Sequence, residues 1–196
     1  AVQGKGEVWL SKLARGEPLR RKPGGMREMQ GTPGALGPIR MFESCAGATQ
    51  PMSHAGRDSG QFRPVGLDDQ NPDWRKDMRK RFPDAEIFGD CRGRPDGWLT
   101  HMQVSFVQIS PPCDDWSIAG KRRGRATPEG SLLVRQCDQY RNEYWGIGVP
   151  AVYVENVQGF RSFFGEKSLE EGFAELMPDY FVTVKTMEAD QIVSPA

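Results

Sequence analysis

Apolar segments of strand length alternate with segments of helix length along most of this chain. We predict strands at 39–42, 62–67, 85–88, 102–109, 151–154 and 180–184, and helices ending near 55–56 and spanning 73–82, 129–144 and 169–176. Strands separated by helices are joined by crossover connections, which place the strands side by side in parallel. The sequence therefore predicts an α/β fold with a doubly wound, mostly parallel sheet.

The first 37 residues differ from the rest in being rich in Gly, Pro and basic residues. Pro23-Gly24-Gly25 and Thr32-Pro33-Gly34 are typical of a tether, although Val8-Trp9-Leu10 could dock onto the body of the protein. We therefore expect residues 1–37 to be an N-terminal extension and residues 38–196 to form one domain, which is a normal size for a single core.

Acidic and basic residues balance at 26 each, so the whole chain carries no polyanion-binding charge. Basic clusters at 20–22, 75–81 and 121–125 are candidates for local nucleic-acid contacts, although each is more often a solvated face. The sequence shows no signal peptide and no apolar run long enough to cross a bilayer. We expect a cytoplasmic protein, or a nuclear one if the source is eukaryotic.

The chain has four cysteines and only two histidines, with no CxxC pair, so zinc-site spacing is absent. Low cysteine density in a chain of this length favours reduced thiols over a disulfide framework. Cys137 falls with Leu133, Tyr140 and Tyr144 on one face of the predicted 129–144 helix, which is typical of core packing. Cys137 is therefore predicted to be structural.

Polar residues recur directly after the predicted strands. A small-residue turn, Ser44–Gly47, follows the first strand, and Asp68, Asp90, Cys113 and Glu155 follow later ones. In an open α/β sheet, ligands bind at the carboxyl ends of the strands. A small-residue turn lets a ligand approach the backbone, and an acidic residue after the second strand can bind ribose hydroxyls. The pattern favours a cofactor that contains a nucleoside.

Cys113 is the most informative of these residues. Pro111 and Pro112 end an apolar strand and present the thiol at its carboxyl end. The loop after it carries Lys121, Arg122 and Arg123 between two glycines. An isolated cysteine is more often a buried structural residue, but a thiol beside a cationic loop suits a nucleophile that meets an anionic polymer.

These residues resemble the cytosine-C5 DNA methyltransferase family over roughly residues 38–196. Pro112-Cys113-Asp114 and Trp116–Lys121 match its Pro-Cys-Gln motif and following loop, and Glu155-Asn156-Val157 matches its Glu-Asn-Val motif. Phe42–Gly47 is a degraded form of its first motif, and Ala55-Gly56 and Gly89-Asp90 follow in family order. The resemblance implies the Rossmann-like fold of S-adenosylmethionine-dependent methyltransferases, here in part.

The resemblance also implies a mechanism. Cytosine C5 is a poor nucleophile, and addition of a thiolate to C6 makes it enamine-like, so Cys113 is expected to be the catalytic nucleophile. Glu155, in its protonated form, is expected to donate to N3, with Asn156 supporting the substrate site. S-adenosylmethionine would supply the methyl group. The target cytosine would be flipped out of the DNA duplex.

The same resemblance assigns the binding residues. Phe42 would stack on adenine, Asp68 would hold the ribose, and Asp90 would take the adenine amino group, with Ser44, Gly47 and Pro112 completing the cofactor site. Ser117, Lys121, Arg122 and Arg123 would contact DNA phosphates. Asp69 rivals Asp68 because the spacing does not decide between them. Phe42 could instead be core, Asp68 and Asp90 turn formers, and Glu155 a helix cap.

Several positions depart from the family pattern. Asp114 replaces a glutamine and places a carboxylate beside the thiol, which disfavours the thiolate. Ser44 and Ala46 replace glycines. The family's Gln-x-Arg-x-Arg motif, target-recognition region and final motif have no match in these 196 residues. The chain is then a portion of a larger enzyme, one half of a split enzyme whose partner chain reads DNA, or a weakly active or inactive binding relative. An RNA-directed relative is less favoured.

Overall fold

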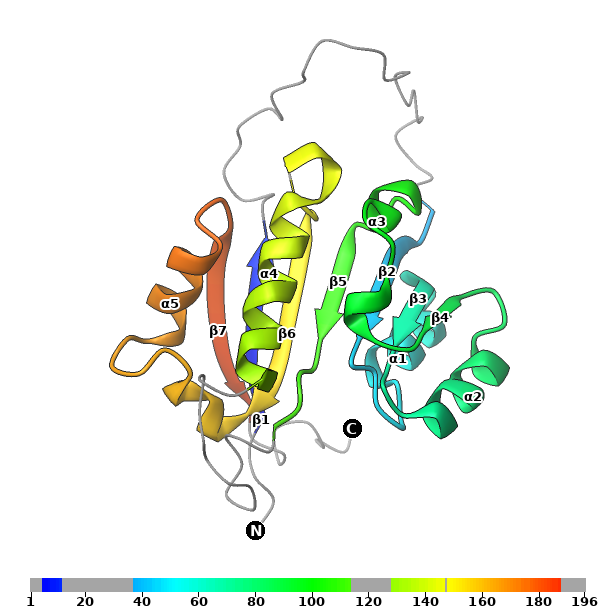
Figure 1. Ribbon diagram of the computed structural model, residues 1–196, viewed down its shortest axis with the longest axis horizontal. Helices are drawn as coiled ribbons and strands as arrows, with labels where there is room; N and C mark the ends of the chain where they lie inside the picture. The colour runs from blue at the N-terminus through cyan, green and yellow to red at the C-terminus, as the bar shows by residue number, and fades with distance from the viewer. Residues whose placement is uncertain (1–4, 12–36, 114–127, 147, 188–196) are drawn as a thin grey trace.

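A computed structural model describes residues 5–11, 37–113, 128–146 and 148–187, and its strands form a single sheet (Figure 1). The strand order is β4-β3-β2-β5-β6-β1-β7. The strands span β1 Lys5–Ser11, β2 Ile39–Ser44, β3 Phe62–Asp68, β4 Glu86–Phe88, β5 Phe106–Ile109, β6 Ala151–Val157 and β7 Phe181–Met187. Strands β4, β3, β2, β5 and β6 are parallel to one another. The predicted doubly wound α/β sheet is confirmed.

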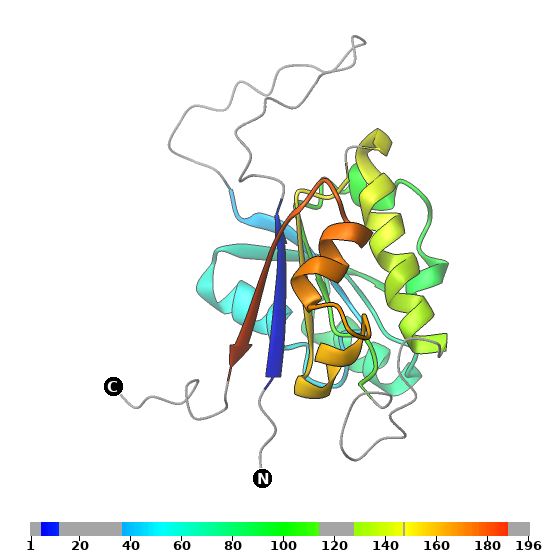
Figure 2. The same cartoon turned by 90° about the vertical axis from the view of Figure 1, so that its left-hand side faces the viewer.

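Helices cover both faces of this sheet. They span α1 Pro51–Ser59, α2 Pro72–Arg81, α3 Trp98–His101, α4 Pro128–Gly146 and α5 Leu169–Leu176. Helices α3, α4 and α5 lie on one face and α1 lies on the other (Figure 2). His54 of α1 and Phe82 at the end of α2 are in ring contact at 5.0 Å, which places α2 beside α1.

One strand of the sheet comes from the first 37 residues, which we expected to be an extension. Strand β1 lies between β6 and β7 and is antiparallel to both, with Val8 opposite Val154 on one side and Val184 on the other (Figure 1). Because β1 supplies the hydrogen-bonding partners of both neighbours, β7 joins the sheet only through it.

Helix α1 and strands β5 and β6 are among the elements whose boundaries differ from the predictions. Helix α1 runs past Gly56 to Ser59 and is capped by Gly60 in the left-handed conformation. The apolar run predicted as a strand from Met102 begins its strand only at Phe106, because α3 and the following turn take its first residues. Strand β6 continues through Val157, so Glu155 lies within the strand near its end.

The main core fills the space between the sheet and helices α3, α4 and α5. Leu133 and Cys137 are fully buried and Tyr140 is 1% exposed, which confirms the predicted core stripe of α4. On the same face, the Phe42 ring lies 5.7 Å from the Trp98 ring in an edge-on contact. Gly66 leaves the room for this pair, because a β carbon there would lie 2.4 Å from the Trp98 ring and 3.0 Å from the Phe42 ring.

Glu43 fastens helix α1 to β2 on the opposite face. Its buried carboxylate accepts hydrogen bonds from the backbone N–H of Ser53 at 2.7 Å and of Met52 at 3.4 Å, within the first turn of the helix. Carboxylates are favoured at this end of a helix, where backbone N–H groups lack helical partners. Burial nevertheless dominates and raises the pKa of Glu43 to about 7.

Substitution of Gly66 by Ala should destabilise the protein by about 1–3 kcal/mol, because an added methyl group overpacks the Phe42–Trp98 contact. Gly37→Ala is the matched control, since a β carbon at Gly37 meets nothing within 4 Å. That control should stay within about 0.5 kcal/mol of the wild type in urea unfolding. Equal losses in the two variants would contradict this account of the core.

The raised pKa of Glu43 also predicts a pH dependence of stability. The ordinary pKa of a glutamate is 4.5, and the pKa of Glu43 in the folded protein is about 7. Between these two pH values the unfolded chain loses the Glu43 proton while the folded chain keeps it. The free energy of unfolding should therefore fall as pH rises through this window. Glu43→Gln keeps an oxygen acceptor for the helix and should reduce this fall in urea titrations at pH 5 and pH 8. An unchanged or steeper fall in the variant would contradict the assignment.

Candidate active site

The residues predicted to act together lie at one edge of the sheet. Ser44 and Asp68 end β2 and β3, Asp90 follows β4, and Cys113 follows β5. Glu155 lies near the end of β6. Because these strands are parallel, their carboxyl ends meet at the same edge, as Figure 1 shows.

The Asp68 carboxyl group accepts hydrogen bonds from the end of β2 and from the turn that follows it. The Ser44 hydroxyl donates to the Asp68 carboxylate at 3.0 Å, and the Cys45 N–H donates to it at 2.8 Å. Gln136 of α4 donates to the Ser44 hydroxyl oxygen at 2.6 Å. Ser44 is fully buried and Asp68 is 1% exposed. This chain of bonds joins β2, β3 and α4 beneath the turn.

Burial changes the acidity of Asp68. Desolvation raises its pKa from 3.8 to about 7, against the hydrogen bonds from Cys45 and Ser44 and the charge of Arg94, which favour the carboxylate. Asp68 is therefore protonated in a large fraction of molecules at neutral pH. A buried acid whose two oxygens are already engaged is suited to fixing the turn.

Asp69 lies between the turn and the start of α2. Its carboxylate accepts from the Gly47 N–H at 2.9 Å and from the Asn71 N–H at 2.8 Å. Asp69 is 9% exposed, more than Asp68. Gly47 has a positive φ of 65° and open space where a side chain would start, since a β carbon would meet nothing within 4 Å. A ligand can therefore approach the backbone here.

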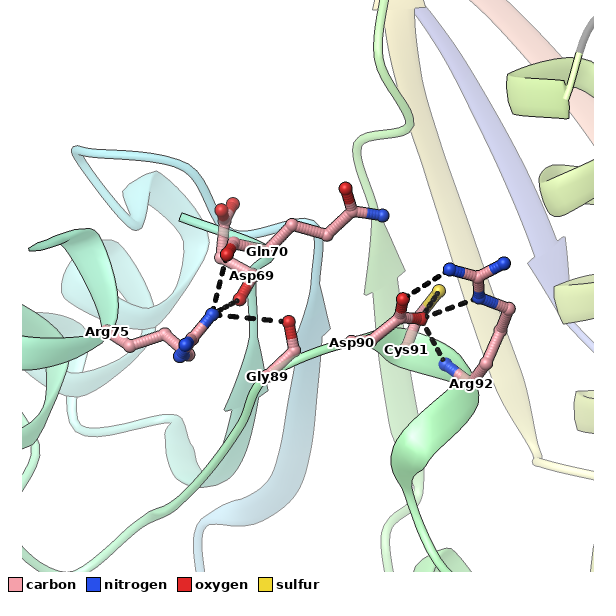
Figure 3. A network of polar contacts seen from close by, with 7 residues as sticks. All are labelled: Asp69, Gln70, Arg75, Gly89, Asp90, Cys91 and Arg92. Atoms are coloured by element: carbon pink, nitrogen blue, oxygen red, sulfur yellow. Dashed lines mark hydrogen bonds and ion pairs between the residues drawn. The ribbon is translucent and has the colours of Figure 1, made fainter. Parts of the chain in front are cut away.

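Asp90 carries a carboxylate that is held by Arg92. The carboxylate accepts from the Arg92 backbone N–H at 2.8 Å and from its Nε at 2.9 Å, as Figure 3 shows. These bonds lower the pKa of Asp90 to about 2. Arg75 supports the same edge, because its guanidinium donates to the backbone oxygens of Asp69 and Gly89 (Figure 3). Asp90 is therefore ionised at neutral pH and partly exposed, as an acceptor for an amino group must be.

Two hydrogen bonds tie the loop that carries Cys113 to strand β6. The Ser110 hydroxyl donates to Glu155 Oε2 at 3.1 Å, and the Asn156 side-chain amide donates to the Pro111 carbonyl at 3.2 Å. Cys113 and Glu155 are both half-buried. The thiol and the carboxyl group therefore belong to one braced unit. Asn156 is 3% exposed and holds the loop through its bond to the Pro111 carbonyl.

Two other cysteines are unsuited to act as nucleophiles. Burial raises the pKa of the Cys137 thiol to about 12. The pKa of the Cys45 thiol is raised well above its usual value, mainly by a hydrogen bond with Cys91 and secondly by burial. Only the thiolate form of cysteine is a good nucleophile. Cys113 follows β5 and is half-buried, whereas Cys137 is fully buried.

Phe42 and Ser44 do not lie where the cofactor assignment requires. The Phe42 ring is fully buried against Trp98 and Phe88, so neither ring face can stack on a ligand in this structure. Ser44 is likewise closed off beneath the turn by Asp68 and Gln136. The interpretation of Phe42 as core, which the sequence left open, accounts for its position.

The predicted phosphate contacts Ser117, Lys121, Arg122 and Arg123 lie outside the described residues, as do Asp114 and the basic clusters at 20–22 and 121–125. Pro112 lies inside them and is exposed beside Cys113. The cluster at 75–81 forms the later part of α2 up to its last residue, and Arg81 there pairs with Asp77 at 2.6 Å. Among the described helices, none is long and apolar enough to cross a membrane.

The sequence interpretation missed three residues of this edge: Gln136, Arg92 and Ser110. Gln136 could have been found, because it lies three residues after Leu133 and four before Tyr140 and is thus a polar residue on the buried stripe of α4. Arg92 and Ser110 carried no such signal, since their partners come from local turn geometry and from a neighbouring strand.

Comparison with solved structures finds chains of the same fold. An Entamoeba histolytica methyltransferase, EhMeth, has a TM-score of 0.51 at 19% identity, covering 74% of this chain and 43% of that one. The Dnmt2 methyltransferase of S. pombe has a TM-score of 0.50 at 16% identity, covering 70% and 39%. A Spodoptera frugiperda DNMT2 mutant has a TM-score of 0.49 at 20% identity, covering 72% and 41%. The chain thus spans less than half the length of these proteins.

No curated protein sequence matches the chain. A family model does: that of the C-5 cytosine-specific DNA methylases matches residues 38–195, which include every residue of the edge described above. The five parallel strands, the cysteine after β5 and the glutamate of β6 all lie within this match, whereas β1 lies outside it. The chain therefore belongs to the C-5 cytosine-specific DNA methylase family.

Proposed function

We propose that this chain carries the catalytic centre of an S-adenosylmethionine-dependent DNA cytosine-5 methyltransferase, with Cys113 as nucleophile and Glu155 as proton donor. The observation that carries the proposal is the pair of hydrogen bonds from Ser110 and Asn156, which join the Cys113 loop to the strand of Glu155. Covalent addition to a pyrimidine needs a nucleophile and an acid in fixed relation, because proton transfer must accompany attack.

The proposed reaction forms and breaks bonds in balance. The Cys113 thiolate adds to C6 of a flipped cytosine, and Glu155 gives a proton to N3, so that the ring takes up no net charge. The electron-rich C5 then takes a methyl group. Loss of the C5 proton to a base, return of the N3 proton to Glu155 and cleavage of the bond from C6 to sulfur restore the aromatic ring and release Cys113 as a thiolate. Asn156 keeps the loop in place throughout by its bond to Pro111.

S-adenosylmethionine, when bound, supplies an electrophilic methyl group. The residues present fit its nucleoside part. The open space at Gly47 admits a ligand to the backbone, and the ionised Asp90 can accept from the adenine amino group. For the ribose hydroxyls we propose Asp69, because Asp68 is 1% exposed and its oxygens already hold the turn. Each Asp69 oxygen has one protein donor and a second lone pair for a hydroxyl.

We propose DNA as the substrate. That a second chain supplies the target-recognition region and selects the DNA sequence remains a prediction. The loop residues Ser117, Lys121, Arg122 and Arg123 are the proposed phosphate contacts of the catalytic half. Because such contacts are sequence-independent, they would position DNA without choosing a site.

The first test is a covalent trap. The protein should form a denaturant-resistant adduct with 5-fluorocytosine DNA and S-adenosylmethionine, because fluorine at C5 blocks the final elimination. Single-stranded or mismatched DNA should react faster than paired duplex, since flipping then costs less. Cys113→Ser should abolish the adduct on denaturing gels, whereas Cys137→Ala, which removes a buried thiol, should keep it.

Each other outcome has a defined meaning. An equal adduct with Cys113→Ser would overturn the assignment of the nucleophile. An adduct with 5-fluorocytidine RNA and none with DNA would show that the substrate is RNA and not DNA. Measurable cofactor binding without any adduct would favour a binding or regulatory protein of the same fold over an enzyme.

The second test separates the two neighbouring aspartates. Asp69→Asn should weaken binding of S-adenosylhomocysteine about 10-fold or more in calorimetry, because a ribose hydroxyl loses a charged acceptor. Asp68→Asn keeps an oxygen for the Cys45 N–H and should change the affinity less. If Asp68→Asn weakens binding more, at unchanged thermal stability, the ribose assignment returns to Asp68.

A further inference from the structure

Ser110 lies at a junction between three strands. It follows β5 directly, its backbone N–H donates to the Ser44 carbonyl of β2 at 3.1 Å, and its hydroxyl donates to Glu155 of β6 at 3.1 Å. It also precedes the Pro111-Pro112-Cys113 segment that carries the nucleophile. No other residue of the described edge is shown bonded to both the cofactor turn and the proposed acid.

Gln108 determines which way the Ser110 hydroxyl points. The Gln108 side-chain amide N–H donates to the Ser110 oxygen in a short contact, and Gln108 is 1% exposed on β5. A hydroxyl has one proton to give. With its oxygen accepting from Gln108, the Ser110 proton is directed to Glu155 Oε2.

Gln108 is an unusual residue for this place. Its Oε1 is buried with no hydrogen-bond partner among the described residues, although a buried carbonyl without a partner is costly. A leucine of similar volume would avoid that cost. What the glutamine provides instead is the donor to Ser110.

We propose that Ser110, oriented by Gln108, is a positioning residue that holds the Glu155 carboxyl group through a hydrogen bond to Oε2 and so sets its orientation at the site. The proposal rests on the proposed role of Glu155 as proton donor. A hydroxyl that donates to one carboxyl oxygen favours the ionised form and the tautomer with the proton on the other oxygen. Glu155 would then present its proton in one direction, which general-acid catalysis requires.

The strand register also places charged residues on the strands beside Glu155. Across β1, the strand register places Glu7 opposite Glu155 and Lys185 opposite Glu7, and the Cys113 loop follows β5 on the other side. On β5 the neighbouring side chain is the neutral Gln108, which lies opposite Glu43 of β2 in register. These groups are the same in every variant below, so differences between variants report on the hydroxyl.

The test is a titration of the Glu155 carboxyl carbon by NMR in glutamate-labelled protein, with the signal assigned by its loss in Glu155→Gln. Ser110→Ala should raise the midpoint of this titration by about one pH unit, because the carboxylate loses a donor. Ser110→Thr keeps a hydroxyl and should stay within about 0.3 units. Ser162→Ala removes a hydroxyl that donates to the Gly159 carbonyl, so it should leave the midpoint unchanged.

Gln108→Leu distinguishes positioning from a structural role. It should raise the midpoint by less than Ser110→Ala, while thermal stability holds or increases because the unpaired Oε1 is gone. A midpoint that does not move, or that falls, in folded Ser110→Ala would overturn the proposal. The titration needs no substrate, so a shift without any adduct in the trapping assay would refute the proposed function and leave the Ser110 inference standing.

Discussion

The candidate site depends on the hydrogen bonds that the buried carboxyl group of Asp68 accepts. Through Ser44 and Cys45 it fixes the turn after β2, and through Ser44 it connects to Gln136 of α4. These contacts join three elements that are far apart in sequence and meet where the cofactor turn begins. Asp68 is 1% exposed, which suits this anchoring role.

Much of the fold could be predicted from periodicity because its elements are locally consistent. Helix α5 has its predicted bounds and begins with a capping box at Ser168 and Glu171, which are signals carried by adjacent residues. Strand β1 could not be placed in the same way. Its apolar centre indicated docking, but its position between β6 and β7 depends on pairing with residues at least 140 positions away, which no local pattern encodes.

The same distinction between local signals and long-range packing applies to the candidate site. Cys113 and Asp90 follow strands as predicted, because a strand end is set by local sequence, whereas Glu155 lies inside β6 near its end and not after it. Which side chain faces a ligand depends instead on packing. Phe42 alternates onto the face of α3 and α4, where Trp98 and Phe88 enclose it, and Ser44 follows two residues later on that face. Family order alone could not reveal that both are covered.

Ser110 connects the two halves of the site. The cofactor half, at β2 and β3, is closed around Asp68, whereas the nucleophile half, at β5 and β6, is braced by Asn156 and Pro111. The Ser110 backbone N–H bonds to the Ser44 carbonyl at the end of β2 and its hydroxyl bonds to Glu155, so this one residue contacts both parts of the proposed site.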